Sequence, residues 1–203
     1  MKNARTRLIF SIPISLLALA CLLFPPPVLS QEKVKIGVIS PLTGALAHTG
    51  KDTATGAEVA ADRINAAGGI QVGGKKYLLE IMALDDQLKP DLTVTAVRRM
   101  LGSGVKIICT LATGPSMAAL ELADQEGFLL LPLATSLDLT ARGVKLVLRV
   151  PSTMDYYASS MADTLFTLRP QVEKVGILWN TDPGSKAWGE IFAKTWTGHG
   201  KKW

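Results

Sequence analysis

Short apolar runs alternate with longer segments of helical spacing from Gln31 to the end of this 203-residue chain. The runs have the length of strands, and the segments between them carry apolar residues three and four positions apart, as amphipathic helices do. Strands and helices that alternate in this way build right-handed βαβ units with parallel strands. The sequence therefore predicts an α/β fold, a doubly wound parallel sheet covered on both faces. The strands are expected at 34–39, 77–83, 105–109 and 128–131, and the helices at 50–67, 90–101 and 115–125.

A second α/β lobe is expected to begin after the apolar run 146–150, where Pro151 interrupts the pattern. One strand cannot form a sheet alone, and a parallel strand needs cover on both faces. Either the segment after Pro151 leans on the first domain, or the rest of a second domain is missing. We expect residues 31–150 to form an N-terminal ligand-binding lobe and residues 151–203 to be the incomplete start of a second lobe. The elements expected in that second part are a helix at 154–168, a strand at 174–179 and a helix at 185–196.

The first thirty residues (1–30) are typical of a secretory signal peptide. A basic opening without acidic residues precedes a largely apolar stretch over 8–24, which three prolines end, and the small Ser30 stands at the expected cleavage position. A membrane anchor would need about 20 unbroken apolar residues. We expect cleavage after Ser30 and export to the periplasm. Lipid attachment at Cys21 is the alternative, which the bulky Leu19 beside that cysteine disfavours.

The charge and the cysteines exclude several kinds of function. Of the 22 basic residues three lie in the expected signal peptide, so 19 remain against 17 acidic residues. A nearly neutral chain without a long basic run is not expected to bind nucleic acid. Cys109 is the one cysteine after the signal peptide, and it ends an apolar run, so we expect a buried structural thiol without a disulfide.

Signatures of catalysis are absent from the sequence. It contains no phosphate-binding or dinucleotide-binding glycine motif and no nucleophile elbow. His48 and His199 have no metal-ligand spacing. The adjacent Asp85 and Asp86 have no evident general-base partner, and such a pair is more often solvated or capping a helix. We therefore expect no enzyme activity, no cofactor and no metal.

The loops after the predicted strands are the candidate ligand sites, because open parallel sheets bind ligands beyond the carboxyl ends of their strands. After the strand at 105–109 the free N–H groups of a helix start, with the hydroxyls of Thr113 and Ser116, could bind a carboxylate. The alternative is that Thr113 or Ser116 only caps this helix. The loops at 40–49 and 132–136 add further hydroxyls. Such donors with little formal charge suit a zwitterion or a small neutral solute.

Several motifs occur in an order that resembles one known family. They are KIGVISPLTG at 35–44, INAAGGI at 64–70, DDQ at 85–87, LAT at 133–135 and LRV at 148–150. In this order they resemble the leucine/isoleucine/valine-binding proteins, periplasmic binding proteins of ABC transporters, over about residues 33–196. The resemblance implies the type I periplasmic-binding fold, in which two doubly wound lobes joined by three crossovers close on a ligand.

The resemblance also implies which residues bind that ligand. Two loops of the first lobe match those that hold the α-carboxylate and α-amino groups of an amino acid in the family. Two further positions match aromatic residues beside the ligand side chain, and this chain departs from the common pattern at both, which leaves the side-chain preference open. The matching residues are Leu111, Ala112, Thr113, Leu133 and Thr135 for the first set, and Thr49 and Trp188 for the second.

The resemblance implies a monomeric substrate-binding subunit of an ABC importer, which binds a branched-chain or other small amino acid, or a small amide, and delivers it to a membrane permease. Family members continue past Trp203 with the rest of the second lobe and an acidic residue for the ligand amine, so we expect the chain to be C-terminally truncated. The alternatives are a ligand-sensing receptor domain of the same fold and a non-functional fragment of a binding protein.

Overall fold

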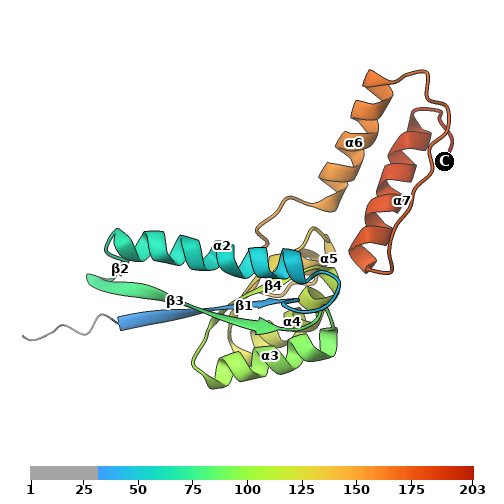
Figure 1. Ribbon diagram of the computed structural model, residues 1–203. Helices are drawn as coiled ribbons and strands as arrows, with labels where there is room; N and C mark the ends of the chain where they lie inside the picture. Colours follow the sequence, from blue (N-terminus) through green and yellow to red (C-terminus); the bar gives the residue numbers. More distant parts are fainter. Residues whose placement is uncertain (1–31) are drawn as a thin grey trace, which may run out of the picture. The chain divides into compact units, whose positions relative to one another are not determined.

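The structure, a computed structural model, describes residues 32–203 (Figure 1). The expected signal peptide at 1–30 lies outside the described residues. The strands are β1 (Glu32–Ser40), β2 (Ile70–Val72), β3 (Lys75–Asp85), β4 (Ile107–Leu111) and β5 (Leu129–Leu133). They form a five-stranded sheet with the order β2-β3-β1-β4-β5. All neighbours pair in parallel except β2, which runs antiparallel to β3.

Helices make the crossovers that parallel neighbours require. The crossover helices are α2 (Ala47–Ala66), α3 (Pro90–Gly102) and α4 (Thr113–Glu126). Three more helices follow β5: α5 (Asp138–Ala141), α6 (Met154–Leu168) and α7 (Pro183–Gly198). Figure 1 shows α2 on one side of the sheet and α3 on the other. The predicted α/β class and the doubly wound sheet are confirmed.

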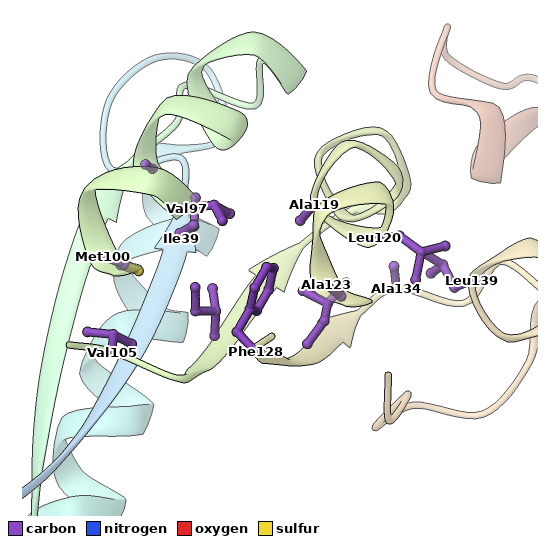
Figure 2. Close-up of a cluster of buried hydrophobic side chains, with 13 residues drawn as sticks. Ile39, Val97, Met100, Val105, Ala119, Leu120, Ala123, Phe128, Ala134 and Leu139 are labelled. Carbon is purple, nitrogen blue, oxygen red and sulfur yellow. The ribbon is translucent and has the colours of Figure 1, made fainter. Parts of the chain in front are cut away.

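The main core lies between the sheet and the helices α3 and α4. Ile39 of β1, Val97 and Met100 of α3, and Phe128 before β5 are almost completely buried in it (Figure 2). Burial of one such side chain stabilises a fold by about 1.5–3 kcal/mol. This cluster therefore fixes the strands whose carboxyl ends carry the candidate site.

The motif Asn65–Gly69 joins the end of α2 to β3. The Asn65 side-chain amide donates to the Leu79 carbonyl and accepts from the Leu79 N–H, both at 2.8 Å. Gly69 has a φ of +80°, and a Cβ there would lie 2.2 Å from the Tyr77 carbonyl oxygen. The left-handed backbone and this close approach both require glycine. The motif that carries the family resemblance thus has a structural task at the edge of the sheet.

The segment 174–179, predicted as a strand, is not one, and the apolar run 146–150 forms no strand either. Each makes only one isolated bridge. Leu148 is 60% exposed and Leu178 is 99% exposed. A strand needs a neighbour along its length. The prediction for 174–179 was wrong because apolar composition does not reveal whether such a neighbour is present.

Some boundaries also differ from the prediction. β4 begins at Ile107, two residues later than predicted, because its pairing with β1 and β5 starts there, although Val105 before it is already buried in the core. α2 begins at Ala47, so His48 and Thr49 lie inside the helix instead of before it. The short elements β2 and α5 were not predicted, since three or four residues carry no recognisable period.

The helices α6 and α7 pack against each other around a second, smaller cluster. Ala158 and Ala162 of α6 meet Phe192 and Trp196 of α7. The Trp196 indole N–H also donates to the Lys202 carbonyl at 2.9 Å. The helix predicted at 154–168 is confirmed, and α7 begins two residues earlier than predicted. The division of the chain into lobes at residue 150 stays a prediction.

None of the helices in the described range combines the length and the apolarity needed to cross a membrane.

Candidate ligand-binding site

The four parallel strands end at one edge of the sheet, and Asp85 ties two of their loops together there. Its carboxylate accepts from the Leu42 N–H at 2.8 Å and the Gln87 N–H at 2.9 Å, and also from the Thr43 hydroxyl. Partial burial acts to raise the pKa of Asp85, but these hydrogen bonds hold it below its ordinary value. Asp85 therefore positions the loop after β1 against the end of β3.

Asp86 has a second structural task in the same loop. Its side chain is fully buried and accepts from the Leu88 N–H at 3.0 Å and the Thr93 hydroxyl at 2.9 Å. Burial raises the pKa of Asp86. Asp86 is buried whereas Asp85 is partly exposed, and both carboxylates accept from the backbone of the turn that leads into α3.

The turn between β4 and α4 has the most unusual backbone at this edge. Ala112 has φ +69° and ψ 161°, a conformation that is nearly restricted to glycine and costs about 1–3 kcal/mol in other residues. Its N–H donates to the Leu133 carbonyl at 3.4 Å, and its own carbonyl accepts from the Ser116 N–H at 3.2 Å. Strain of this kind concentrates at ligand sites, because the surrounding structure must hold it in place.

The start of α4 leaves backbone N–H groups without a side-chain cap from its own turn. Alanine, which has no acceptor, stands at the N-cap position, so the alternative that Thr113 or Ser116 caps this helix is wrong. The Ser116 hydroxyl bonds the Thr110 hydroxyl at 2.9 Å inside the protein, which takes Ser116 out of the predicted anion site. Thr113 is the first residue of the helix and is only 5% exposed. A helix start of this kind favours a negative group.

The loop after β5 lies directly beside this turn. Leu111 and Leu133 are partners in the pairing of β4 with β5. The Thr135 carbonyl accepts from the Met154 N–H at 2.9 Å, so the loop is also bound to the start of α6. The structure therefore brings five predicted residues together on two adjacent strand ends. They are Leu111, Ala112, Thr113, Leu133 and Thr135.

The other two predicted residues lie on α2 and α7, outside these two loops. Thr49 is exposed in the first turn of α2, where its carbonyl accepts from the Thr53 hydroxyl at 2.9 Å. The Trp188 ring stacks on Phe192 with 5.4 Å between ring centroids, as part of the α6–α7 cluster. Neither contact points to a ligand, so a role of Thr49 or Trp188 in binding stays a prediction.

Asp182 is a residue of this edge that the sequence prediction missed. It caps α7, since one carboxylate oxygen accepts from the Gly184 N–H at 2.9 Å and the Ser185 N–H at 3.2 Å. The other oxygen accepts from the Gly114 N–H, in the first turn of α4, at 3.4 Å. Aspartate followed by Pro183 is a typical helix start, a signal that could have revealed the cap but not its contact with α4.

One hollow and one thiol lie apart from the predicted site residues. A hollow of about 510 Å³ lies along residues 147–156, and none of the predicted site residues lines it. Cys109 is half-buried, less than predicted, and burial raises the pKa of its thiol to about 11. In the part of the chain that the structure describes, no three His, Cys, Asp or Glu side chains gather as metal ligands.

Comparison with known proteins decides the family. Residues 33–200 match the family model described as periplasmic binding protein. The chain belongs to this family. A curated relative, the Leu/Ile/Val-binding protein homolog 3 of Brucella melitensis biotype 1, is 39% identical over 132 residues, which are 64% of this chain and 35% of the relative. The Leu/Ile/Val-binding protein BraC3 of Rhizobium johnstonii is 35% identical over 145 residues, which are 70% of this chain and 38% of that protein.

Solved structures of periplasmic binding proteins show the same fold. A leucine-binding protein from Thermotoga maritima has a TM-score of 0.71 and 22% identity, covering 83% of this chain and 47% of its own. A solute-binding protein of an ABC transporter from Rhodopseudomonas palustris, solved with 3,4-dihydroxybenzoic acid, has a TM-score of 0.69 and 25% identity, covering 84% and 45%. The chain spans less than half the length of these relatives.

Proposed function

We propose that this chain binds a small amino acid as the substrate-binding component of an ABC importer, with leucine, isoleucine and valine as the first candidates. The observation that carries this proposal is the shared description of the curated relatives as Leu/Ile/Val-binding proteins. In this proposal the protein is exported to the periplasm, delivers its ligand to a membrane permease as a monomer, and catalyses no reaction.

The carboxylate of the ligand would bind at the start of α4. The backbone N–H groups there have no cap from their own turn, and Thr113 adds a hydroxyl. The strained Ala112 supports this assignment, because it sets the direction of the backbone at that turn. Hydrogen bonds to a charged carboxylate are about twice as strong as neutral ones. The hydrogen bonds to its carboxylate would therefore do most to orient the ligand in the site.

The amino group of the ligand would bind on the β5 side of the same edge. The Thr135 hydroxyl can accept from an ammonium group, whereas the Thr135 carbonyl already accepts from the Met154 N–H. The segment 150–152, between β5 and α6, would act as a hinge when lobes close. A ligand that touches both lobes stabilises the closed state by its difference in affinity for the two states.

An aromatic carboxylate is the second candidate ligand. The Rhodopseudomonas palustris neighbour contains 3,4-dihydroxybenzoic acid, which shares only its carboxylate with an amino acid. A site built from backbone N–H groups recognises that shared group and not the rest of the ligand. The test of the proposal therefore includes both kinds of ligand.

The proposal is tested by thermal unfolding of the full chain with a ligand panel. The panel contains leucine, isoleucine, valine, alanine, threonine and 3,4-dihydroxybenzoate. A ligand at a hundred times its dissociation constant should stabilise the folded state by about 2.7 kcal/mol. We expect this for at least one branched-chain amino acid. If every ligand leaves the unfolding temperature unchanged, the proposed function is wrong.

A matched pair of variants locates the binding. Thr113→Val keeps the shape of the side chain but removes the hydroxyl at the start of α4. It should therefore lower the affinity for leucine about tenfold, which reduces the stabilisation that leucine gives. Thr95→Val makes the same change at an exposed position of α3 and should leave it unaltered. Equal binding by both variants would place the ligand elsewhere.

A further inference from the structure

The Asp182 carboxylate connects the starts of two helices. Its Oδ2 accepts from two N–H groups of the first turn of α7, at 2.9 and 3.2 Å. Its Oδ1 accepts from the Gly114 N–H in the first turn of α4, at 3.4 Å. Each helix start carries about half a positive charge, so one carboxylate between two of them is held by both.

The start of α7 also covers the Thr113 side chain. A Cβ built on Gly184 would lie 2.4 Å from the Thr113 hydroxyl oxygen and 3.3 Å from its Cβ. Only glycine permits this approach, and Thr113 is buried as a result. The two groups assigned above to a ligand carboxylate, the N–H groups of α4 and the Thr113 hydroxyl, are therefore both covered by the chain itself.

We propose that Asp182 stands in for the ligand carboxylate at the start of α4, and that a ligand must displace it in order to bind. This inference rests on the proposed function for its physiological ligand, but the contact itself can be tested with any carboxylate. Asp182 would then determine specificity. It excludes weak anions from the empty site and admits only ligands whose further contacts compensate for its displacement.

The geometry makes this displacement easy. The bond to Gly114 is longer than the usual range for N–H···O bonds, whereas the two bonds to α7 lie near or within it. A small rotation can release Gly114 while Oδ2 still caps α7. None of the ion pairs found among residues 32–203 includes Asp182, so no cation has to be separated from it.

The test uses Asp182→Ser in the full chain, with acetate as the carboxylate probe. Serine still caps α7, because it is a favoured N-cap residue, but it brings no negative charge to Gly114. Binding is measured from the NMR shift of the Gly114 amide during an acetate titration. We expect the variant to bind acetate about fivefold more tightly than the wild type.

Acetate that shifts the Gly114 amide equally in both proteins, or in neither, would overturn the inference. Asp182→Ala is the second variant, because it lacks the cap and separates any effect of α7 stability from the effect of charge. Leucine is then titrated into both proteins. If neither the wild type nor the variants bind leucine, while Asp182→Ser still binds acetate more tightly than the wild type, the proposed function is refuted but the role of Asp182 is supported.

Discussion

Asn65→Ala should destabilise the sheet edge by a measurable amount. The Asn65 amide makes two hydrogen bonds of 2.8 Å to the backbone of Leu79. Both are part-buried, so water can only partly replace them. A typical hydrogen bond contributes about 0.5–1.5 kcal/mol net, and the variant leaves a donor and an acceptor of β3 without partners. We therefore expect a loss of about 2 kcal/mol in the free energy of unfolding.

The assay is urea unfolding of the full chain, followed by far-ultraviolet circular dichroism. Gln71→Ala is the matched control. It truncates an exposed side chain on β2, whose backbone pairing stays intact, and should change stability by less than about 0.5 kcal/mol. If Asn65→Ala were as mild as Gln71→Ala, the assignment of the asparagine motif to sheet stability would be refuted.

Three further predictions follow from single contacts. Gly50→Ala should destabilise the fold by about 1–3 kcal/mol in urea unfolding, because its Cβ would lie 2.0 Å from the Pro41 carbonyl oxygen. Gly56 lies in the same helix with open space around it, so Gly56→Ala should instead stabilise the fold by about 0.5–1 kcal/mol. The Cys109 thiol has a pKa of about 11, so its rate of reaction with a disulfide reagent should rise about tenfold per pH unit between pH 8 and 10. A reaction rate that stops rising near pH 8.5 would contradict the burial of this thiol. The pKa of Asp85 is lowered on folding, so its ionised carboxylate stabilises the fold relative to Asp85→Asn. This difference should have its full size at pH values well above 3.8 and should disappear as the pH falls through the pKa of the folded state. Urea midpoints of both proteins across pH 2–7 would show it.

The sequence predicted the fold class well, because the periods of strands and helices are local properties of the chain. The helix predicted near 154–168 spans Met154–Leu168, and the motifs at 35–44 and 64–70 place Gly44, Gly68 and Gly69 at turns with positive φ. The segment 174–179 was predicted incorrectly as a strand. Whether an apolar run becomes a strand depends on a neighbouring strand, and a single sequence does not reveal one.

The candidate site was predictable only in part. The turn with Leu111 and Thr113 and the loop with Thr135 lie together, as parallel strands require. Ser116 was assigned to the anion site, but its hydroxyl bonds Thr110 inside the protein. The contact of Asp182 with Gly114 spans 68 positions of sequence, and no local pattern could have indicated it.

Isothermal titration of the full chain with leucine and with leucinamide tests the central claim most directly. The two ligands differ only in the group that we assign to the start of α4. If a carboxylate binds there, leucine should bind and leucinamide should bind at least about a hundredfold more weakly, since a site of backbone donors loses charge-assisted hydrogen bonds to an amide. Equal affinities for leucine and leucinamide, or no heat with either, would contradict the account.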